Sequence, residues 1–472
     1  MAFRMKNIKG RDYAYDVKTV WDKEEKKYKK QTKYLGVVTD KEAKTYERKR
    51  NPKIVEEKLI LDYGDAYILN ETAKNSGLCE VFDNVLPREA DTLWSLVFFK
   101  ILTDLAFVYA EAWYDGNYVS LLYEKANISS QRVSEFLKKL GAEKVNREFF
   151  RNYLNVVADK ECGIIIDSTG LPNEMDSPVS KFGYHGGNTE QETRLIMVVD
   201  HKTGTPLYFR YVAGNIVDVS TLKNTVLELG NMGVKSTFAL LDAGYFSESN
   251  IKSLYSEKID FLTRLPAGRK LFKQLIVETN DALEKSENLI IYNGRSLFIK
   301  CVEMDLFDNK GFAYVVCDLK RKLNESNKYL IEAKEDGAAN DEIDAELRFK
   351  GKFVLVSSKL LDTSEVIPLY YTRQHAERLF GIQKSVLDCL PLRTHSEATL
   401  RGLLLLNFMA LVLFTQLQKS IGNFCTAEEI LLEARNLKCK VYDDSIVISE
   451  PNKKFKIICE KLGYTVPKNS GV

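Results

Sequence analysis

Four polar side chains recur at helical spacing in the segment 370–384, which reads YYTRQHAERLFGIQK. Tyr370, Arg373, Glu377 and Lys384 stand at i, i+3, i+7 and i+14, so at about 100° per residue they fall within roughly 60° of one helix face. That face combines a phenol, a guanidinium, a carboxylate and an ammonium group. Such a set suits a divalent metal ion beside a phosphodiester, because the carboxylate can hold the ion while Arg and Lys hold phosphate oxygens.

The opposite face of the same predicted helix is apolar. It collects Tyr371, Leu379, Ile382 and Val386, a stripe that would pack on a core and fix the rotation of the helix. For a helix taken alone, charged residues at this spacing more often form a solvated face with weak i,i+4 pairs. The functional interpretation therefore depends on what the rest of the chain brings to this helix.

Two further carboxylates follow short apolar runs that are typical of buried strands. Asp167 comes directly after the run 164–166, and Asp242 closes the segment 236–242, STFALLD. Taken singly, an Asp at the end of a strand is commonplace in turns. Taken together, two parallel strands that end in Asp and a packed helix that offers Glu377 would converge on one site. Carboxylate oxygens with open positions select Mg²⁺ or Mn²⁺, and two such ions can clamp the attacking and leaving oxygens of a displacement at phosphorus.

The hydrophobic pattern predicts an α/β core around these residues. After the Asp167 strand the predicted elements are, in order, strands at 194–199 and 206–213, a helix at 219–229, the Asp242 strand, a helix from 248 and a strand at 261–265. This order resembles that of the ribonuclease H-like fold, and the helix at 370–384 supplies its final element. Between them, the segment 266–361 alternates like antiparallel strands around one charged helical stretch, so we predict a β-rich subdomain inserted into the core.

The predicted flanking regions are a hairpin and a set of helices. Residues 13–38 form the hairpin, whose second strand is rich in Lys, residues 39–60 are predicted to be a polar helix, and residues 89–109 a buried apolar helix. The segment 129–141 has a Ser at its start and a Gly at its end, which predicts a further helix. It is either part of a helix-turn-helix, with Gln131, Arg132 and Glu135 facing DNA, or a plain helical hairpin, which we favour.

The fold class is therefore α/β, with a ribonuclease H-like mixed-sheet core interrupted by a β-rich insertion subdomain and an α-rich N-terminal region preceded by a β-hairpin. The predicted domains are 1–60 (basic hairpin and linker), 61–160 (helical, with DNA-binding potential), 161–265 (core, first part), 266–361 (insertion), 362–420 (core, second part) and 421–472 (C-terminal region).

Bulk properties are those of an ordinary soluble protein. The chain has 472 residues, 45% hydrophobic and 28% charged, with a net charge of +2. Residues 1–60 hold 18 Lys or Arg against 10 Asp or Glu, about +8, which is compatible with nucleic-acid contact or with a merely soluble surface. The start of the chain lacks the apolar segment of a secretory signal, and the apolar run at 403–414 is interrupted by Asn407, which indicates a buried helix and no membrane span. The eight cysteines include no C-x-x-C pair, so we expect reduced thiols, no zinc site and a cytoplasmic location.

The ordered set of motifs resembles that of the DDE transposases, in particular bacterial insertion-sequence transposases with a Tyr-Arg-Glu-Lys signature. The resemblance covers 163–413, a little over half of the chain. Its parts are the IIIDSTG strand, a GN..D element at Gly214, Asn215 and Asp218, the LLDAGYFS strand, and the complete signature at Tyr370, Arg373, Glu377 and Lys384. The specificity of the resemblance comes from the order of the first three parts together with the fourth.

The resemblance implies an activity and a role for each residue. Asp167, Asp242 and Glu377 would be catalytic and would hold two Mg²⁺ or Mn²⁺ ions, with Asp167 as the bridge. Tyr370, Arg373 and Lys384 would bind DNA phosphates near the transposon end. The activity implied is cut-and-paste transposition, in which the enzyme cleaves at the terminal inverted repeats and the released 3′-hydroxyl attacks target DNA. A homodimer is expected, because two transposon ends must be paired. Its expected location is the cytoplasm, in association with the nucleoid.

One departure from the family concerns the aromatic residue on which relatives can stack a flipped base. The only tryptophans, Trp21, Trp94 and Trp113, all precede the predicted insertion, so Tyr292, Phe312 or Tyr314 would have to serve instead. His375 falls on the anchored face of its helix and is predicted to pack or to form a hydrogen bond. Asp200 and Asp218 are predicted to be turn or cap residues.

Three alternatives have different signatures. A non-mobile ribonuclease H-like nuclease would cleave DNA without strand transfer, and a catalytically inactive DNA-binding descendant would do neither. A metal hydrolase of small phosphoesters fits the carboxylates but leaves Arg373, Lys384 and the large flanking regions unexplained.

Overall fold

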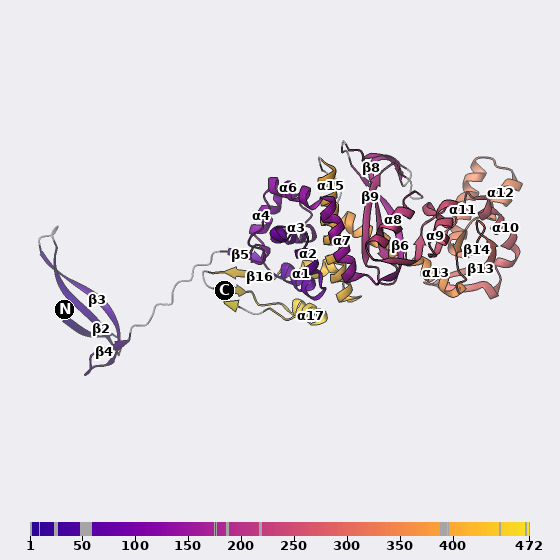
Figure 1. The fold of residues 1–472 in the computed structure, drawn as a ribbon. Helices are drawn as coiled ribbons and strands as arrows, with labels where there is room; N and C mark the ends of the chain where they lie inside the picture. Colours follow the sequence, from indigo (N-terminus) through magenta and orange to yellow (C-terminus); the bar gives the residue numbers. More distant parts are fainter. Residues whose placement is uncertain are drawn as a thin grey trace. The chain divides into compact units, whose positions relative to one another are not determined.

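A computed structural model describes the chain over residues 2–8, 10–22, 27–47, 59–173, 175, 177–185, 188–216, 220–387, 394, 396–442, 445–467 and 470–471. The chain forms two compact units (Figure 1). The first comprises Met1–Leu59, Val441–Ile446 and Ser470–Val472, and the second comprises Ile60–Lys440 and Val447–Asn469.

The first unit is built on a four-stranded antiparallel sheet in the order β1-β2-β3-β4. Its strands are β1 (Ala2–Ile8), β2 (Arg11–Asp22), β3 (Lys27–Asp40) and β4 (Thr45–Glu47). The pairing of β2 with β3 confirms the predicted hairpin. The predicted helix at 39–60 is wrong as far as residue 47, because β3 continues to Asp40 and the chain then returns as β4, which pairs with Val37 and Val38.

The second unit begins with a layer of helices. They are α1 (Gly64–Asn75), α2 (Leu78–Asp83), α3 (Ala90–Leu102), α4 (Ala110–Asp115), α5 (Val119–Leu122), α6 (Ser130–Leu140) and α7 (Glu143–Val157), with 3-10 turns at Pro87–Glu89 and Phe107–Tyr109 and a short strand, β5 (Leu59–Asp62), before them. The predicted apolar helix at 89–109 is buried as expected, but it ends at Leu102 instead of continuing through Tyr109.

The predicted helix at 129–141 is confirmed as α6, with Ser129 and Gly141 at its cap positions. Its apolar face packs against a later helix, α15 (Glu397–Ile421), at a very close approach. A Cβ atom at Gly402 would lie 1.9 Å from the Leu137 carbonyl oxygen, so only glycine fits there. Gln131, Arg132 and Glu135 lie on the exposed face of α6. This position agrees both with a helix-turn-helix and with a plain helical hairpin.

The centre of the second unit is a ten-stranded mixed sheet. Its first six strands are β6 (Glu161–Pro172), β7 (Lys181–His185), β8 (Asn188–Asp200), β9 (Pro206–Ala213), β10 (Lys235–Leu241) and β11 (Asp260–Arg264), with α8 (Leu222–Asn231) and α9 (Glu248–Ser256) between them. Five of these strands lie in the order β9-β8-β6-β10-β11. β6, β10 and β11 run parallel, and β8 is antiparallel to β6 and to β9. Ile164, Ile165 and Ile166 are fully buried, which confirms the prediction of a central strand covered on both faces.

The segment predicted as an insertion extends the same sheet. Its strands are β12 (Leu289–Tyr292), β13 (Arg295–Asp305), β14 (Lys310–Asp318) and β15 (Lys352–Ser357), and its helices are α10 (Lys270–Leu283), α11 (Leu319–Glu335) and α12 (Asn340–Leu347), with a 3-10 turn at Ser286–Asn288. Because β15 pairs antiparallel with β11, these strands continue the core sheet rather than forming a sheet of their own. The strands were predicted, but α10 was not, so the segment is less β-rich than expected.

The single helix predicted at 370–384 is wrong, because the segment is divided into three pieces. α13 (Thr363–Tyr371) is followed by α14 (Gln374–Gly381) and by a π-helical turn at Ile382–Val386. At the break the backbone changes from i→i+4 to i→i+3 bonding, as in the bonds from Arg373 N to Tyr370 O and from Ala376 N to Arg373 O. The assumed 100° per residue therefore does not hold across the segment.

The long helix α15 passes through the interior of the second unit. By length and composition alone it could cross a membrane, as could the pair Pro87–Leu102 and Phe107–Asp115 if their 116° bend were ignored. In the fold α15 is a core helix, because residues such as Leu405, Phe408 and Leu413 have no exposed surface. The chain ends with α16 (Ala427–Ala434), β16 (Lys438–Val441), β17 (Ser445–Ile448), α17 (Lys453–Leu462) and β18 (Ser470–Gly471).

Candidate active site

Asp167 lies in the middle of β6, opposite Met197 of β8. The strand was predicted to end at this residue, but it continues to Pro172 because β8 pairs with it as far as Glu192. The carboxylate is mostly enclosed, with 12% of the side chain exposed, and its Oδ1 accepts a hydrogen bond from Ser168 N at 2.9 Å.

Asp242 lies beside Asp167 on the neighbouring strand. β10 runs parallel to β6 with Leu241 opposite Ile166, so the residue that follows each partner is an aspartate. Asp242 itself begins a 3-10 turn, Ala243–Tyr245. The two strands therefore bring the two carboxylates together at one level of the sheet, as the sequence predicts.

Glu377 approaches the strands from α14, which packs against β6 and β8. Ala376, Leu379 and Phe380 are buried on the inner side of this helix. His375 packs closely over the turn between β8 and β9, where a Cβ atom at Gly204 would lie 2.9 Å from His375 Nδ1. This contact confirms the prediction that His375 is a packing residue, and burial of its imidazole lowers the pKa of His375.

Arg373 joins all three carboxylates. Its Nη1 atom lies 3.0 Å from Asp167 Oδ2 and 3.8 Å from Asp242 Oδ1, and its Nη2 atom lies 2.6 Å from Glu377 Oε1. Acidic side chains that are separated by up to 210 residues in the chain thus surround one guanidinium group. The convergence predicted for Asp167, Asp242 and Glu377 is present in the fold.

The electrostatics of this cluster are those of a buried carboxylate near other acids. Burial raises the pKa of Asp167 to about 6, the positive charge of Arg373 opposes that rise, and the charges of Asp242 and Glu377 add to it. For Arg373, burial by itself would lower the pKa, but the surrounding carboxylates raise the pKa above its usual value. Arg373 thus supplies the positive charge that lets three acids lie together.

The donor atoms are of the kind that binds hard divalent cations. Carboxylate oxygens are typical ligands of Mg²⁺ or Mn²⁺. Within the described ranges, however, no group of three or more His, Cys, Asp or Glu side chains lies close enough to hold a metal ion. The chemistry of the ligands fits such an ion, while the guanidinium of Arg373 lies at the point that the three acids share.

Lys384 also lies at this site, although it is on the π-helical turn. Its Nζ atom donates a hydrogen bond of 2.6 Å to Oγ1 of Thr169, which is two residues beyond Asp167 on β6. Because side chains at i and i+2 of a strand lie on the same face, Lys384 is held beside Asp167. Thr169 was not predicted as a site residue, and the period-two spacing from Asp167 was the one signal that pointed to it.

The position of Tyr370 differs from the prediction, which placed it on the polar face of a single helix. Only 7% of the residue is exposed, and burial raises the pKa of its phenol. Its neighbour Tyr371, assigned to the apolar face, stacks on Tyr292 with the ring centres 5.3 Å apart. Tyr370 is therefore a buried residue next to Arg373 rather than part of an open polar face.

The other predicted contacts have mixed outcomes. Tyr314 is fully buried and Phe312 is 8% exposed, so neither is available to stack on a base, and Tyr292 is occupied by Tyr371. Asp200 accepts hydrogen bonds from the backbone of Lys202 and Thr203, which confirms it as a turn residue. Asp218 of the GN..D element lies outside the described residues.

Comparison with known families agrees with this geometry. The sequence model of a family described as the transposase DDE domain matches residues 158–413, which is more than half of the chain and includes all three carboxylates. The chain therefore belongs to the DDE transposase family.

Among solved structures, the chain is similar to the piggyBac transposase in its cryo-EM synaptic complex with hairpin DNA. The identity is 10% and the TM-score 0.41, over 73% of this chain and 70% of that one. It is also similar to the Drosophila P element transposase in a strand transfer complex, with 12% identity and a TM-score of 0.16 over 64% of this chain and 76% of that one. No curated protein sequence matches the chain.

Proposed function

We propose that this protein is an active transposase that cuts DNA at the ends of a mobile element and joins the freed 3′-hydroxyl ends to target DNA. The observation that carries the proposal is the contact of one guanidinium, that of Arg373, with Asp167, Asp242 and Glu377 together. Membership of the DDE transposase family supports the same reaction.

The central strands support a ribonuclease H-like core. Their order, β9-β8-β6-β10-β11, with β8 antiparallel to both neighbours and β6, β10 and β11 parallel, resembles the sheet of that fold. The Tyr370, Arg373, Glu377 and Lys384 pattern further resembles the bacterial insertion-sequence branch of the family. We assign the chain to that branch as part of the proposal.

Asp167, Asp242 and Glu377 would hold the divalent ions, Mg²⁺ or Mn²⁺. Two ions held there would clamp the attacking and leaving oxygens of an in-line displacement at phosphorus. Because Arg373 contacts all three carboxylates in the described structure, we infer that its guanidinium turns towards a DNA phosphate when the ions bind. Lys384, which now donates to Thr169, is placed to bind a phosphate on the same face of β6.

No side-chain nucleophile is needed in this reaction, since water and a DNA 3′-hydroxyl take that part. The residues of the chain orient the phosphodiester and hold the charge that builds up around it. We infer that two copies act together, because two ends of the element must be brought into one complex.

The test is a strand-transfer assay with Mg²⁺ or Mn²⁺ and DNA that carries the inverted repeats flanking the gene. We expect cleaved ends and joined products from the wild type and neither from Asp167→Asn or Glu377→Gln. Glu335→Gln, an exposed substitution of the same chemical kind on α11, is the matched control and should keep full activity.

The result also separates the alternatives. Cleavage without joined products would indicate a nuclease that does not transpose. Absence of any metal-dependent cleavage by the wild type would indicate an inactive DNA-binding descendant, and full activity of Asp167→Asn would show that the carboxylates are assigned wrongly.

A further inference from the structure

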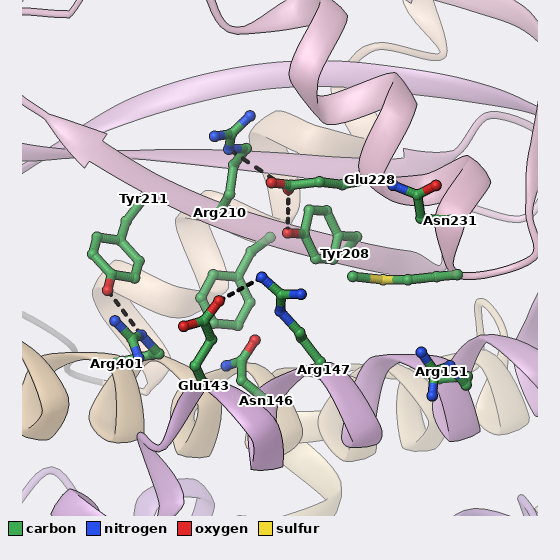
Figure 2. Close-up of a pocket in the computed structure, with 12 residues that line it drawn as sticks. Glu143, Asn146, Arg147, Arg151, Tyr208, Arg210, Tyr211, Glu228, Asn231 and Arg401 are labelled. Carbon is green, nitrogen blue, oxygen red and sulfur yellow. Dashed lines mark hydrogen bonds and ion pairs between the residues drawn. The ribbon is translucent and has the colours of Figure 1, made fainter.

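A cavity of about 490 Å³ lies at the β9 edge of the sheet, outside the carboxylate site. Residues of α7 and of β9 form opposite walls, and residues of α8 and Arg401 of α15 complete the lining (Figure 2). The proposed function uses none of these residues.

The cavity is rich in arginine. Arg147, Arg151, Arg210 and Arg401 line it, against two carboxylates, Glu143 and Glu228. Arg147 pairs with Glu143, and Arg210 lies 3.9 Å from Glu228, which also accepts a hydrogen bond from Tyr208. Arg401 pairs at 3.2 Å with Glu397, which lies outside the lining. Arg151 is therefore the arginine of the four whose charge no carboxylate of the described structure offsets, and this uncompensated charge favours an anion.

Arg151 has no ion pair or hydrogen bond within the part of the chain that the structure describes, and it is exposed to solvent. In Figure 2 it lies at one end of the cavity, on the same helix as Arg147. A guanidinium without a protein partner at the rim of a cavity is available to bind a ligand.

Two donors deeper in the lining also have no acceptor. Arg210 Nη1 and Asn146 Nδ2 are both sheltered from solvent without a hydrogen-bond partner in the described structure. A buried donor left unsatisfied destabilises the folded protein, so an occupant whose acceptor oxygens reach these donors would relieve that destabilisation. An anion with acceptor oxygens, such as a phosphate group, meets both the charge and the hydrogen-bonding requirement.

The position of the cavity relates it to the carboxylates. Phe209 of β9 is opposite Met197 of β8, which is opposite Asp167 of β6. With about 4.8 Å between neighbouring strands, β9 lies roughly 10 Å from Asp167, which is about the rise of three base-pair steps along the axis of a DNA duplex. A DNA molecule bound at the carboxylates is therefore near enough to reach the cavity.

We propose that this cavity is a second DNA-binding site, which holds a backbone phosphodiester of the DNA that is cleaved. The proposal rests on the proposed function, because it takes DNA as the substrate. Arg151 and Arg147 meet the phosphate from α7, and Arg210 and Asn146 donate to it from inside the cavity.

The experiment measures binding of the full-length protein to a fluorescent DNA duplex by anisotropy, without divalent metal, over about 50 to 200 mM salt. Arg151→Gln should weaken binding roughly 3- to 10-fold and reduce the slope of log K against log salt by about 0.9. Lys144→Gln, on the same helix but outside the lining, should change neither quantity. Arg210→Gln should repeat the effect of Arg151→Gln from inside the cavity, and circular dichroism checks that each variant is folded.

Two results would overturn the proposal: Arg151→Gln binds DNA as tightly as the wild type, or Lys144→Gln weakens DNA binding as much as Arg151→Gln does. In either case the arginines act only as surface charge. A second arm measures the melting temperature with ATP and with inorganic phosphate. Stabilisation by ATP that depends on Arg151, with DNA binding unchanged, would assign the cavity to a free nucleotide instead. Metal-dependent cleavage is assayed on the same protein preparations after Mg²⁺ is added, so that loss of the cavity site with intact cleavage is distinguished from failure of the transposase assignment itself.

Discussion

Among single residues, Arg373 is the one for which the predicted contact and the observed contact differ. The helical pattern placed its guanidinium on phosphate oxygens, while the structure pairs it with Asp167, Asp242 and Glu377. The predicted and the observed contact rest on the same chemistry, since carboxylate and phosphate present similar oxygen pairs to a guanidinium. Without metal, the positive charge of Arg373 offsets the repulsion among the three carboxylates.

Asp167→Asn is expected to stabilise the metal-free protein at neutral pH. The pKa of Asp167 in the folded state is about 6, above its ordinary value of 3.8, so the folded protein holds more protons in that window and its stability falls as the pH rises through it. Above pH 6 the ionised carboxylate costs about 3 kcal/mol, and Asn should recover a large part of this. The measurement is urea unfolding in EDTA at several pH values.

For that variant, the difference from the wild type should shrink as the pH is lowered from about 7 to about 4. A variant that is less stable than the wild type at pH 7 would show that hydrogen bonding by the carboxylate outweighs its burial.

Arg373→Gln is expected to have the opposite effect on stability. It leaves three carboxylates without their shared cation, so the free energy of unfolding without metal should fall by about 2–4 kcal/mol. Mg²⁺ or Mn²⁺ should then raise the melting temperature of Arg373→Gln more than that of the wild type. Arg378→Gln, an exposed change on the same helix, is the control and should behave like the wild type. If Mg²⁺ or Mn²⁺ raised the melting temperature of Arg373→Gln and of the wild type equally, the result would argue against ion binding at these acids.

At the scale of elements, the site depends on helices that are fixed by close contacts. α14 is held by its buried face and by His375 against the turn at Gly204. α15 is held against α6 at Gly141 and Gly402, where the two backbones come close enough to exclude any side chain. The contacts of α14 with β6 and β8 determine where Glu377 reaches the strands.

Gly402→Ala should be strongly destabilising. Its Cβ atom would lie 1.9 Å from the carbonyl oxygen of Leu137, and a backbone must move to relieve the overlap, at a cost of about 3 kcal/mol or more. Gly230→Ala in α8 is the matched control, because nothing lies within 4 Å of its Cβ position, and it should stabilise by up to about 1 kcal/mol. Thermal unfolding of both variants measures the contrast, and similar melting temperatures would mean that α6 and α15 are less closely packed than this approach implies.

At the scale of the whole molecule, the chain combines a basic β unit with a larger α/β unit. In the first unit the Lys-rich part of β3 is exposed along most of its length, with Tyr28 73% exposed beside Trp21. Lysines interleaved with exposed aromatic rings are typical of nucleic-acid surfaces. The second unit contains the complete carboxylate site by itself.

Deletion of residues 1–58 is therefore expected to weaken DNA binding without unfolding the second unit. The truncated protein should keep a cooperative thermal transition and show lower affinity and a smaller salt slope, by about 0.9 for each phosphate that the first unit neutralises. Lys30→Gln with Lys33→Gln in the full chain tests the same surface without truncation and should reproduce part of this weakening. Unchanged affinity in both proteins would assign DNA binding entirely to the second unit.

Much of this molecule was predictable from local pattern. The strands before Asp167 and Asp242 are continuous apolar runs, and such runs indicate central strands whatever surrounds them. The hairpin that became β8 and β9, the helix α6 and the burial of α15 follow from period and capping residues in the same way. The three acids could be identified as candidate site residues from the sequence, because strands and helices place side chains at regular intervals.

The remaining features depend on contacts between distant parts of the chain. The break at Arg373, the continuation of β15 onto β11 and the burial of Tyr370 all arise from packing, which local periodicity does not encode. The arginine cavity was missed for the same reason, since its walls come from four separate elements, and only the i,i+4 pair of Arg147 and Arg151 was visible in the sequence.

Residue type and periodicity are local properties, so they were enough to identify the side chains that could do chemistry and the strands and helices that carry them. The meeting of Asp167, Asp242 and Glu377 around one guanidinium, and the contact of Lys384 with Thr169, came from the folded chain. Those distances are set by the register of β6 against β10 and by the packing of α14 on the sheet, which are non-local.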